Sequence, residues 1–152
     1  MKLILQSFIL IVTFLFIFTW EETVLSDYTI PMLAVLIIGL GITYFLYTKR
    51  SKDSNILQYI GVTILTIILF LIIGETGNLY SPVFFLIYFL GFGLALIFEP
   101  SIVFIFALGV VAITLPEALK NNSIESYIKL GSILAVSPLT YFFGREMKLK
   151  KK

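Results

Sequence analysis

The polar residues best suited to binding chemistry gather in one short segment, residues 74–84, between two long apolar runs. This segment offers hydroxyls, an amide side chain, one carboxylate and backbone amides beside apolar neighbours. Gly77 and Asn78 both tolerate a positive φ, and Ser81 followed by Pro82 can cap and open the next helix. The mixture suits a lipid-soluble ligand with polar oxygens, such as a quinone, and the same residues also make a purely structural turn. The candidate ligand-binding residues are Gly77, Asn78, Ser81 and Pro82.

Catalytic machinery is missing from the sequence. The chain has neither histidine nor cysteine, which removes the commonest general base, the usual zinc and haem ligands, and thiolate chemistry. It has no glycine-rich phosphate loop and no serine beside a base, so we expect neither an enzyme nor a metal site. Glu75 and Glu99 fall at predicted helix ends, and Lys129 lies close enough to an end to snorkel to headgroups. No ionisable residue falls at the centre of a predicted helix, which argues against a proton- or ion-coupled transporter.

A resemblance adds to this interpretation. Residues 76–82, followed by an aromatic-rich helix, a proline-marked turn and another helix, resemble the membrane sensor domain of bacterial histidine kinases, with the RegB/PrrB redox sensors as the most similar group. The loop of that group reads T-G-G-x-x-N-P-F, and here Asn78, Ser81 and Val83 replace its second glycine, its asparagine and its phenylalanine. Residues 137–146 resemble the last membrane helix of such kinases.

The resemblance implies a six-helix sensor domain that binds quinone at the loop. Such kinases continue into a transmitter with a phospho-accepting histidine, which this chain lacks. We therefore expect a sensor-like module, free-standing or from a split gene, that acts through a separate cytoplasmic or membrane signalling partner.

The elements that must position the loop are read from hydropathy. Of the 152 residues, 59% are hydrophobic and 13% charged, and the mean hydropathy is +1.05. These values predict an all-α, polytopic membrane bundle. Six apolar runs approach the ~20 residues that a spanning helix needs, although the fourth and fifth are short and could instead be two re-entrant half-helices. The runs cover residues 3–20, 30–47, 56–73, 82–98, 101–115 and 128–144.

Basic residues predict the orientation. With the amino terminus inside, nine of the 11 basic residues fall in cytoplasmic segments, and only Lys120 and Lys129 fall outside. This predicts cytoplasmic N and C termini in the inner (cytoplasmic) membrane of a bacterial cell. It also divides the chain into a bundle over residues 1–144 and a basic cytoplasmic tail over residues 145–152. The tail favours contact with anionic lipid rather than with nucleic acid.

Small residues and prolines indicate how the helices pack. Helices associate in lipid through small residues, and the spacing of Gly91 with Ala95, and of Gly131 with Ala135, places each pair on one helix face. These faces suit packing within the bundle or a homodimer. Pro138 predicts a kink, which is either structural or a hinge before the tail. In the polar stretch of residues 116–127, Ser123 or Ser126 can cap the last helix.

Three functions remain open at this point. The leading hypothesis is a non-catalytic, sensor-like module of a signal-transduction system that responds to a quinone or another lipid-soluble ligand. The alternatives are a small membrane transport component and a structural or assembly subunit.

Overall fold

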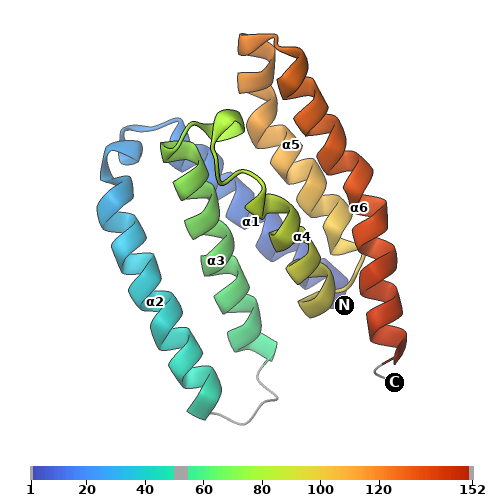
Figure 1. Cartoon of the computed structure of the whole chain (residues 1–152). Coiled ribbons are helices and arrows are strands. Elements are labelled where there is room, and N and C mark those ends of the chain that lie inside the picture. The colour runs from blue at the N-terminus through green and yellow to red at the C-terminus, as the bar shows by residue number, and fades with distance from the viewer. Residues whose placement is uncertain (1, 50–54, 151–152) are drawn as a thin grey trace.

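The computed structural model describes residues 2–49 and 55–150, and within these ranges the chain is helical with no strand (Figure 1). Two short 3₁₀ helices, η1 (Val24–Tyr28) and η2 (Asn78–Tyr80), lie in connections at the same end of the bundle. The α-helices are α1 (Lys2–Glu21), α2 (Thr29–Lys49), α3 (Asn55–Glu75), α4 (Leu86–Ile97), α5 (Ile102–Asn121) and α6 (Ile124–Lys150).

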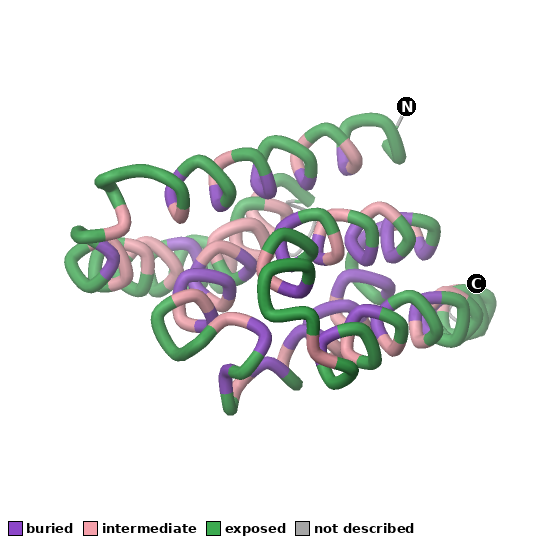
Figure 2. The backbone as a smooth tube through the Cα atoms, turned by 90° about the horizontal axis from the view of Figure 1, so that it is seen from above, coloured by how far each residue is buried: buried purple, intermediate pink, exposed green. Residues whose placement is uncertain are grey.

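The apolar runs correctly predicted an all-α bundle. In the described part of the chain, four helical segments are long and apolar enough to cross a membrane, namely α1, η1 with α2, α3, and α5. Large apolar side chains cover much of the outer surface, and in α2 only Thr29 and Thr43 are buried. Figure 2 shows this pattern, with buried segments facing the interior and exposed ones facing outward. Such a surface is typical of a protein that hydrocarbon solvates.

The fourth predicted helix begins later than expected. Instead of running from Pro82, α4 starts at Leu86 and has 12 residues, about 18 Å, which is too short to span ~30 Å of hydrocarbon. The chain before it turns down from η2 into the bundle (Figure 1). There the side chains of Leu79 and Phe84 are 0% and 4% exposed. Because α5 has 20 residues, the predicted alternative of half-length helices applies to α4 alone.

The connection between α5 and α6 is shorter than the sequence suggested. The sequence suggested that the polar stretch of residues 116–127 separates the last two helices, but α5 continues through Pro116 to Asn121 and α6 begins at Ile124. Ala118 is fully buried, so this extra turn has an apolar contact that favours helix. Asn122 ends α5 with φ of 44°, and the hydroxyl of Ser123 accepts a hydrogen bond from the Ser126 amide at 3.2 Å, as predicted for a cap.

The helices fall into two groups, joined mainly by α1 and also by a smaller contact between α3 and α4. Within the described residues α2 packs on α3 and η1, whereas α4, α5 and α6 pack on one another, and α1 contacts both α3 and α5 (Figure 1). Phe14 of α1 marks the junction, since its ring lies 5.5 Å from Phe70 of α3 and 5.9 Å from Phe106 of α5. This aromatic cluster is the middle of the core.

The two ends of the bundle differ in charge. One end, here called the acidic end, carries Glu21, Glu22, Glu75 and Glu117 at the ends of α1, α3 and α5. The opposite end, here called the basic end, carries Lys2 at the start of α1, Lys49 at the end of α2, and Lys148 and Lys150 at the end of α6. Because α6 continues to Lys150, residues 145–150 belong to that helix.

Some of the predicted small-residue faces are used inside the bundle. Gly91 and Ala95 of α4 are buried, and a Cβ built on Gly144 of α6 would lie 2.8 Å from the Ala95 Cβ and 2.9 Å from its carbonyl oxygen. The backbones of α4 and α6 therefore meet there, as small residues allow. Gly131, in contrast, has no neighbour within 4 Å of its Cβ position.

Pro138 leaves α6 uninterrupted. Proline has no N–H to donate to the carbonyl of Leu134, and the Ser137 hydroxyl donates to that oxygen instead, at 2.8 Å. The predicted role of Pro138 as a hinge stays a prediction.

The contact between α4 and α6 can be tested with two glycines of one helix. We expect Gly144→Ala to lower the free energy of unfolding by ~1–3 kcal/mol, because the added methyl overpacks against Ala95. The matched control, Gly131→Ala, should leave stability equal or higher, since alanine favours helix and nothing lies in its way. Thermal unfolding in one mild detergent measures both, and equal stabilities would contradict the contact.

Candidate functional site: the loop between α3 and α4

The loop begins with two residues in the left-handed region. Gly77 has φ of 115° and Asn78 has φ of 51°, which confirms the positive φ that the sequence suggested at both positions. The amide of Tyr80 then donates to the Gly77 carbonyl at 2.9 Å, and the amide of Ser81 donates to the Asn78 carbonyl at 3.0 Å. The turn thus satisfies part of its own backbone and reverses the chain into the bundle.

The side chain of Ser81 forms hydrogen bonds within the loop itself. Its hydroxyl lies 2.6 Å from the hydroxyl of Thr76 and accepts a hydrogen bond from the Val83 amide at 3.2 Å. The residue is buried, while Pro82 is exposed. Ser81 therefore caps a turn over residues 82–85, rather than α4 as the sequence suggested.

The backbone of Leu79 is held from two sides by charged side chains. A carboxylate oxygen of Glu117, on α5, accepts a hydrogen bond from the Leu79 amide at 3.2 Å. The ammonium of Lys129, on α6, donates to the Leu79 carbonyl at 2.7 Å. Both polar groups of a fully buried residue are thereby paired. We call this arrangement the Leu79 clamp.

Lys129 has further partners around the clamp. It forms an ion pair with Glu125 at 2.7 Å, one turn earlier on α6, and lies 5.1 Å from the centre of the Tyr80 ring. The Tyr80 hydroxyl in turn lies 2.8 Å from that of Ser123 and 3.0 Å from that of Ser126. Lys129 therefore binds the loop, which the expectation of snorkelling to headgroups missed. The spacing of Glu125 and Lys129 was the available sequence signal.

A cavity of about 280 Å³ opens beside the loop, between the acidic ends of α1 and α3 and the start of α2. Of the four predicted ligand-binding residues, only Asn78 lines it, so the structure does not gather that set around one cavity. Gly74 leaves room for the Glu21 carboxylate, which lies 3.0 Å from the position of a Cβ there. The lining comprises Trp20, Glu21, Glu22, Ser26, Thr29, Leu71, Gly74, Glu75 and Asn78. We call it the acidic-end cavity.

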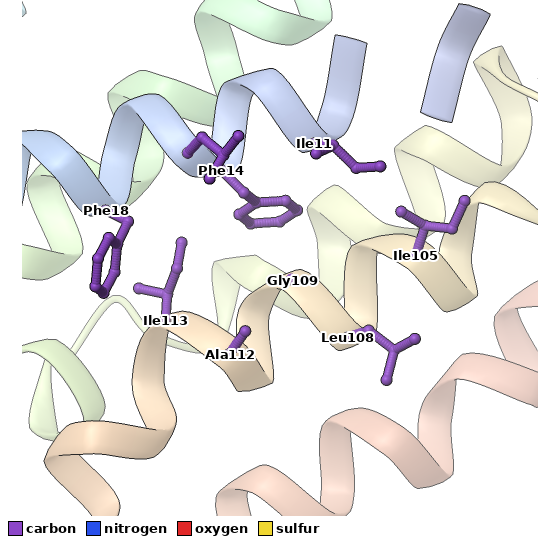
Figure 3. A pocket seen from close by; sticks show the side chains of 9 residues that line it. Ile11, Phe14, Phe18, Ile105, Leu108, Gly109, Ala112 and Ile113 are labelled. Atoms are coloured by element: carbon purple, nitrogen blue, oxygen red, sulfur yellow. The ribbon is translucent and has the colours of Figure 1, made fainter. Parts of the chain in front are cut away.

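An apolar groove of about 420 Å³ runs between α1 and α5. Figure 3 shows Ile11, Phe14 and Phe18 of α1 facing residues of α5 across it. Gly109 makes this approach possible, because a Cβ there would lie 2.3 Å from the Phe14 ring. The groove offers hydrocarbon contacts but no polar side chain. It suits an acyl or prenyl chain and carries no chemistry of its own.

The described residues contain no group of three or more histidine, cysteine or acidic side chains arranged to hold a metal ion. Comparisons of the chain with protein-family models, with curated proteins and with solved structures gave no match. The chemistry of the site therefore rests on its own residues, namely a clamped loop beside a cavity with carboxylate, amide, hydroxyl and indole walls.

The clamp makes a prediction about the loop. We expect Lys129→Met to destabilise the loop by ~1–3 kcal/mol, because the buried Leu79 carbonyl loses its partner. Hydrogen exchange of the amides of residues 79–84, followed by mass spectrometry, should then be faster. The control is Lys120→Met, at an exposed position in the last turn of α5. Equal exchange in both variants would contradict the clamp.

Proposed function

We propose that this chain is a non-catalytic, sensor-type membrane domain in which the loop between α3 and α4 passes a signal to α6. The observation that carries the proposal is the Leu79 clamp, because it ties a loop beside a cavity directly to α5 and α6. A displacement of the loop by a ligand would pull on Lys129, near the start of α6. The resemblance of the loop and of the last helix to histidine-kinase sensor domains supports the same function.

Contacts along the whole length of α6 support the transmission. The Tyr88 hydroxyl of α4 bonds to that of Ser132, and lower down the α4 backbone meets Gly144. At the basic end, the Lys148 ammonium donates to the Phe98 carbonyl and lies 4.0 Å from Glu99. A movement of α4 would thus be carried to the end of α6. Shifting a two-state population from 1:99 to 99:1 takes ~5.5 kcal/mol of differential binding.

The ligand in this proposal is a lipid-soluble molecule with a polar head, such as a quinone, whose head occupies the acidic-end cavity. The Asn78 amide can donate or accept a hydrogen bond, while the carboxylates of Glu22 and Glu75 accept hydrogen bonds but do not donate them when ionised. This lining favours a head group that carries hydroxyl donors, as the reduced quinol does. The prenyl tail would extend into the surrounding hydrocarbon.

The orientation in the proposal places the basic end in the cytoplasm. The lysines at the ends of α2 and α6 lie at that end, and most of the carboxylates lie at the other, although Glu99 and Glu146 lie at the basic end. This distribution agrees with the positive-inside rule. The chain would then cross the cell membrane several times, with the half-length α4 completed by the buried loop. A separate cytoplasmic or membrane partner would read the end of α6.

One observation favours a second candidate, a structural or assembly subunit. Within the described residues α2 packs mainly on α3 and η1, with one hydrogen bond from Trp20 of α1 to Thr29 at its start, so most of its surface is open to a neighbouring membrane helix. Co-purification of one stoichiometric protein partner, with no retained small molecule, would favour this function over the sensor.

The ligand prediction can be tested without straining the turn. We expect wild-type protein, purified in mild detergent and loaded with a short-chain quinol, to retain it, and Asn78→Gly to bind it roughly tenfold more weakly because one hydrogen bond is lost. Glycine accepts the positive φ of Asn78, so the turn itself is preserved. Asn122→Gly is the matched control, since Asn122 also has a positive φ but does not line the acidic-end cavity. Equal binding by both variants would contradict the ligand site.

The orientation has its own test, because the chain has no native cysteine. We expect Thr48→Cys, at the basic end, to resist a membrane-impermeant maleimide in cells with permeabilised outer membranes and to react after lysis. Asn121→Cys, at the acidic end, should react before lysis. Both positions are exposed, so the opposite order would reverse the proposed orientation.

A further inference from the structure

The half of α3 nearest the basic end is separated from α1 by a groove. This groove has a volume of about 400 Å³ and is lined by Leu5, Ile9, Ile56, Tyr59, Ile60, Thr63 and Ile64. A second groove, of about 220 Å³, lies between α3, α2 and Ile97 of α4. Toward the basic end, helix packing therefore contributes little between α3 and α1, whereas α3 stays packed on α2, where the Gln58 amide donates to the Tyr47 hydroxyl at 3.0 Å. This contrasts with the aromatic cluster of Phe14, Phe70 and Phe106 in the middle of the bundle.

One buried side chain bridges this loosely packed region. Gln6 of α1 is 2% exposed, and its amide nitrogen donates to the Tyr59 hydroxyl of α3 at 2.9 Å. Its amide oxygen accepts a hydrogen bond from the Glu99 amide at 3.0 Å, in the turn between α4 and α5. The Tyr59 ring also stands edge-on to Phe98, with ring centres 4.9 Å apart. The Gln6 amide thus links the group of α2 and α3 by hydrogen bonds to the turn between α4 and α5, beside the direct contact of Tyr59 with Phe98.

The neighbouring polar residues of α1 make no such bridge. The hydroxyls of Ser7 and Thr13 donate to the carbonyls of Leu3 and Ile9 in their own helix. Because a buried amide must be paired, the Gln6 bonds hold Tyr59 and the turn at Glu99 in register across α1.

We propose that Gln6 is a latch at the basic end of the bundle, and that its release lets the α2–α3 hairpin move away from α4, α5 and α6. Gln6 lies in the second turn of α1, so the released amide can reach the polar membrane interface instead of remaining unpaired in hydrocarbon. That proximity keeps the closed and released states close in free energy, which a two-state element requires. The hinges at the other end would be the two connections of the hairpin to the rest of the chain, η1 before α2 and the turn of Gly77 and Asn78 after α3.

The latch goes beyond the proposed function, because it needs neither a ligand nor a signalling partner. It describes a movement of the bundle that would exist in the isolated chain. Failure of quinol binding would leave it intact, and a missing latch would leave the cavity and the Leu79 clamp unchanged.

The test is a distance measurement between spin labels at Ile56→Cys on α3 and Phe142→Cys on α6, both exposed positions, in lipid nanodiscs. We expect Gln6→Leu to raise a longer-distance population roughly five- to tenfold over the background, the change that follows from losing the bond to Tyr59, which is the one of the two Gln6 side-chain bonds that reaches α3. Ser7→Ala, next to Gln6 and bonded only within its helix, is the matched control and should match the unmodified background.

A second variant guards against a folding defect in the first. Tyr59→Phe removes only the hydroxyl that Gln6 binds and keeps the ring against Phe98, so it should shift the same population in the same direction. Distance distributions of both variants that coincide with the background would overturn the latch, because packing alone would then hold the two groups together. A shift in Ser7→Ala equal to that in Gln6→Leu would overturn it as well.

Discussion

The pairing of the Leu79 backbone is the interaction on which the arrangement of the carboxyl-terminal half depends. A helix of 12 residues cannot cross a membrane, so the chain before α4 must descend into the bundle without a continuous α-helix, through η2 and a turn. An unpaired backbone group in hydrocarbon costs several kcal/mol, and Leu79, Ser81 and Phe84 of the chain before α4 are buried. Glu117 of α5 accepts a hydrogen bond from the Leu79 amide, and Lys129 of α6 donates one to the Leu79 carbonyl. Two charged side chains thus pair both backbone groups of Leu79.

Several features of α5 and α6 follow from this demand. If α5 ended at Leu115, as the apolar run suggested, Glu117 would not lie on a helix facing the loop. The connection of Asn122 and Ser123 is short enough to keep Lys129 beside Glu117's helix, and Glu125 offsets the charge of Lys129. The lysine is partly desolvated but retains a carboxylate and a carbonyl as partners, as a charge at this depth requires. The ionisable residues that looked peripheral in the sequence therefore organise the loop.

The sequence predicted the parts of this molecule that depend on local patterns. Apolar runs located the long helices, and the preference of Gly77 and Asn78 for positive φ located the turn. It failed where the outcome depends on partners distant in the chain. Residues 82–85 are as apolar as a helix, yet α4 begins only at Leu86, and the preceding Leu79 is held by Glu117 and Lys129, which lie 38 and 50 positions away. The acidic-end cavity could not be predicted from the sequence either, because its walls come from α1, η1, α2, α3 and η2.

Hydrogen bonds of different strength hold the helices together at the two ends of the bundle. At the acidic end, charged groups with several hydrogen-bonding positions hold the loop, and the hydroxyls of Tyr80, Ser123 and Ser126 reinforce them. At the basic end, a neutral amide provides the bridge across α1, with grooves on both sides of α3. Charge-assisted hydrogen bonds are roughly twice as strong as neutral ones. In the proposed latch, the α2–α3 hairpin is therefore held less strongly where α3 begins than the loop is held where α4 begins, so a displacement of the loop would be taken up at the basic end.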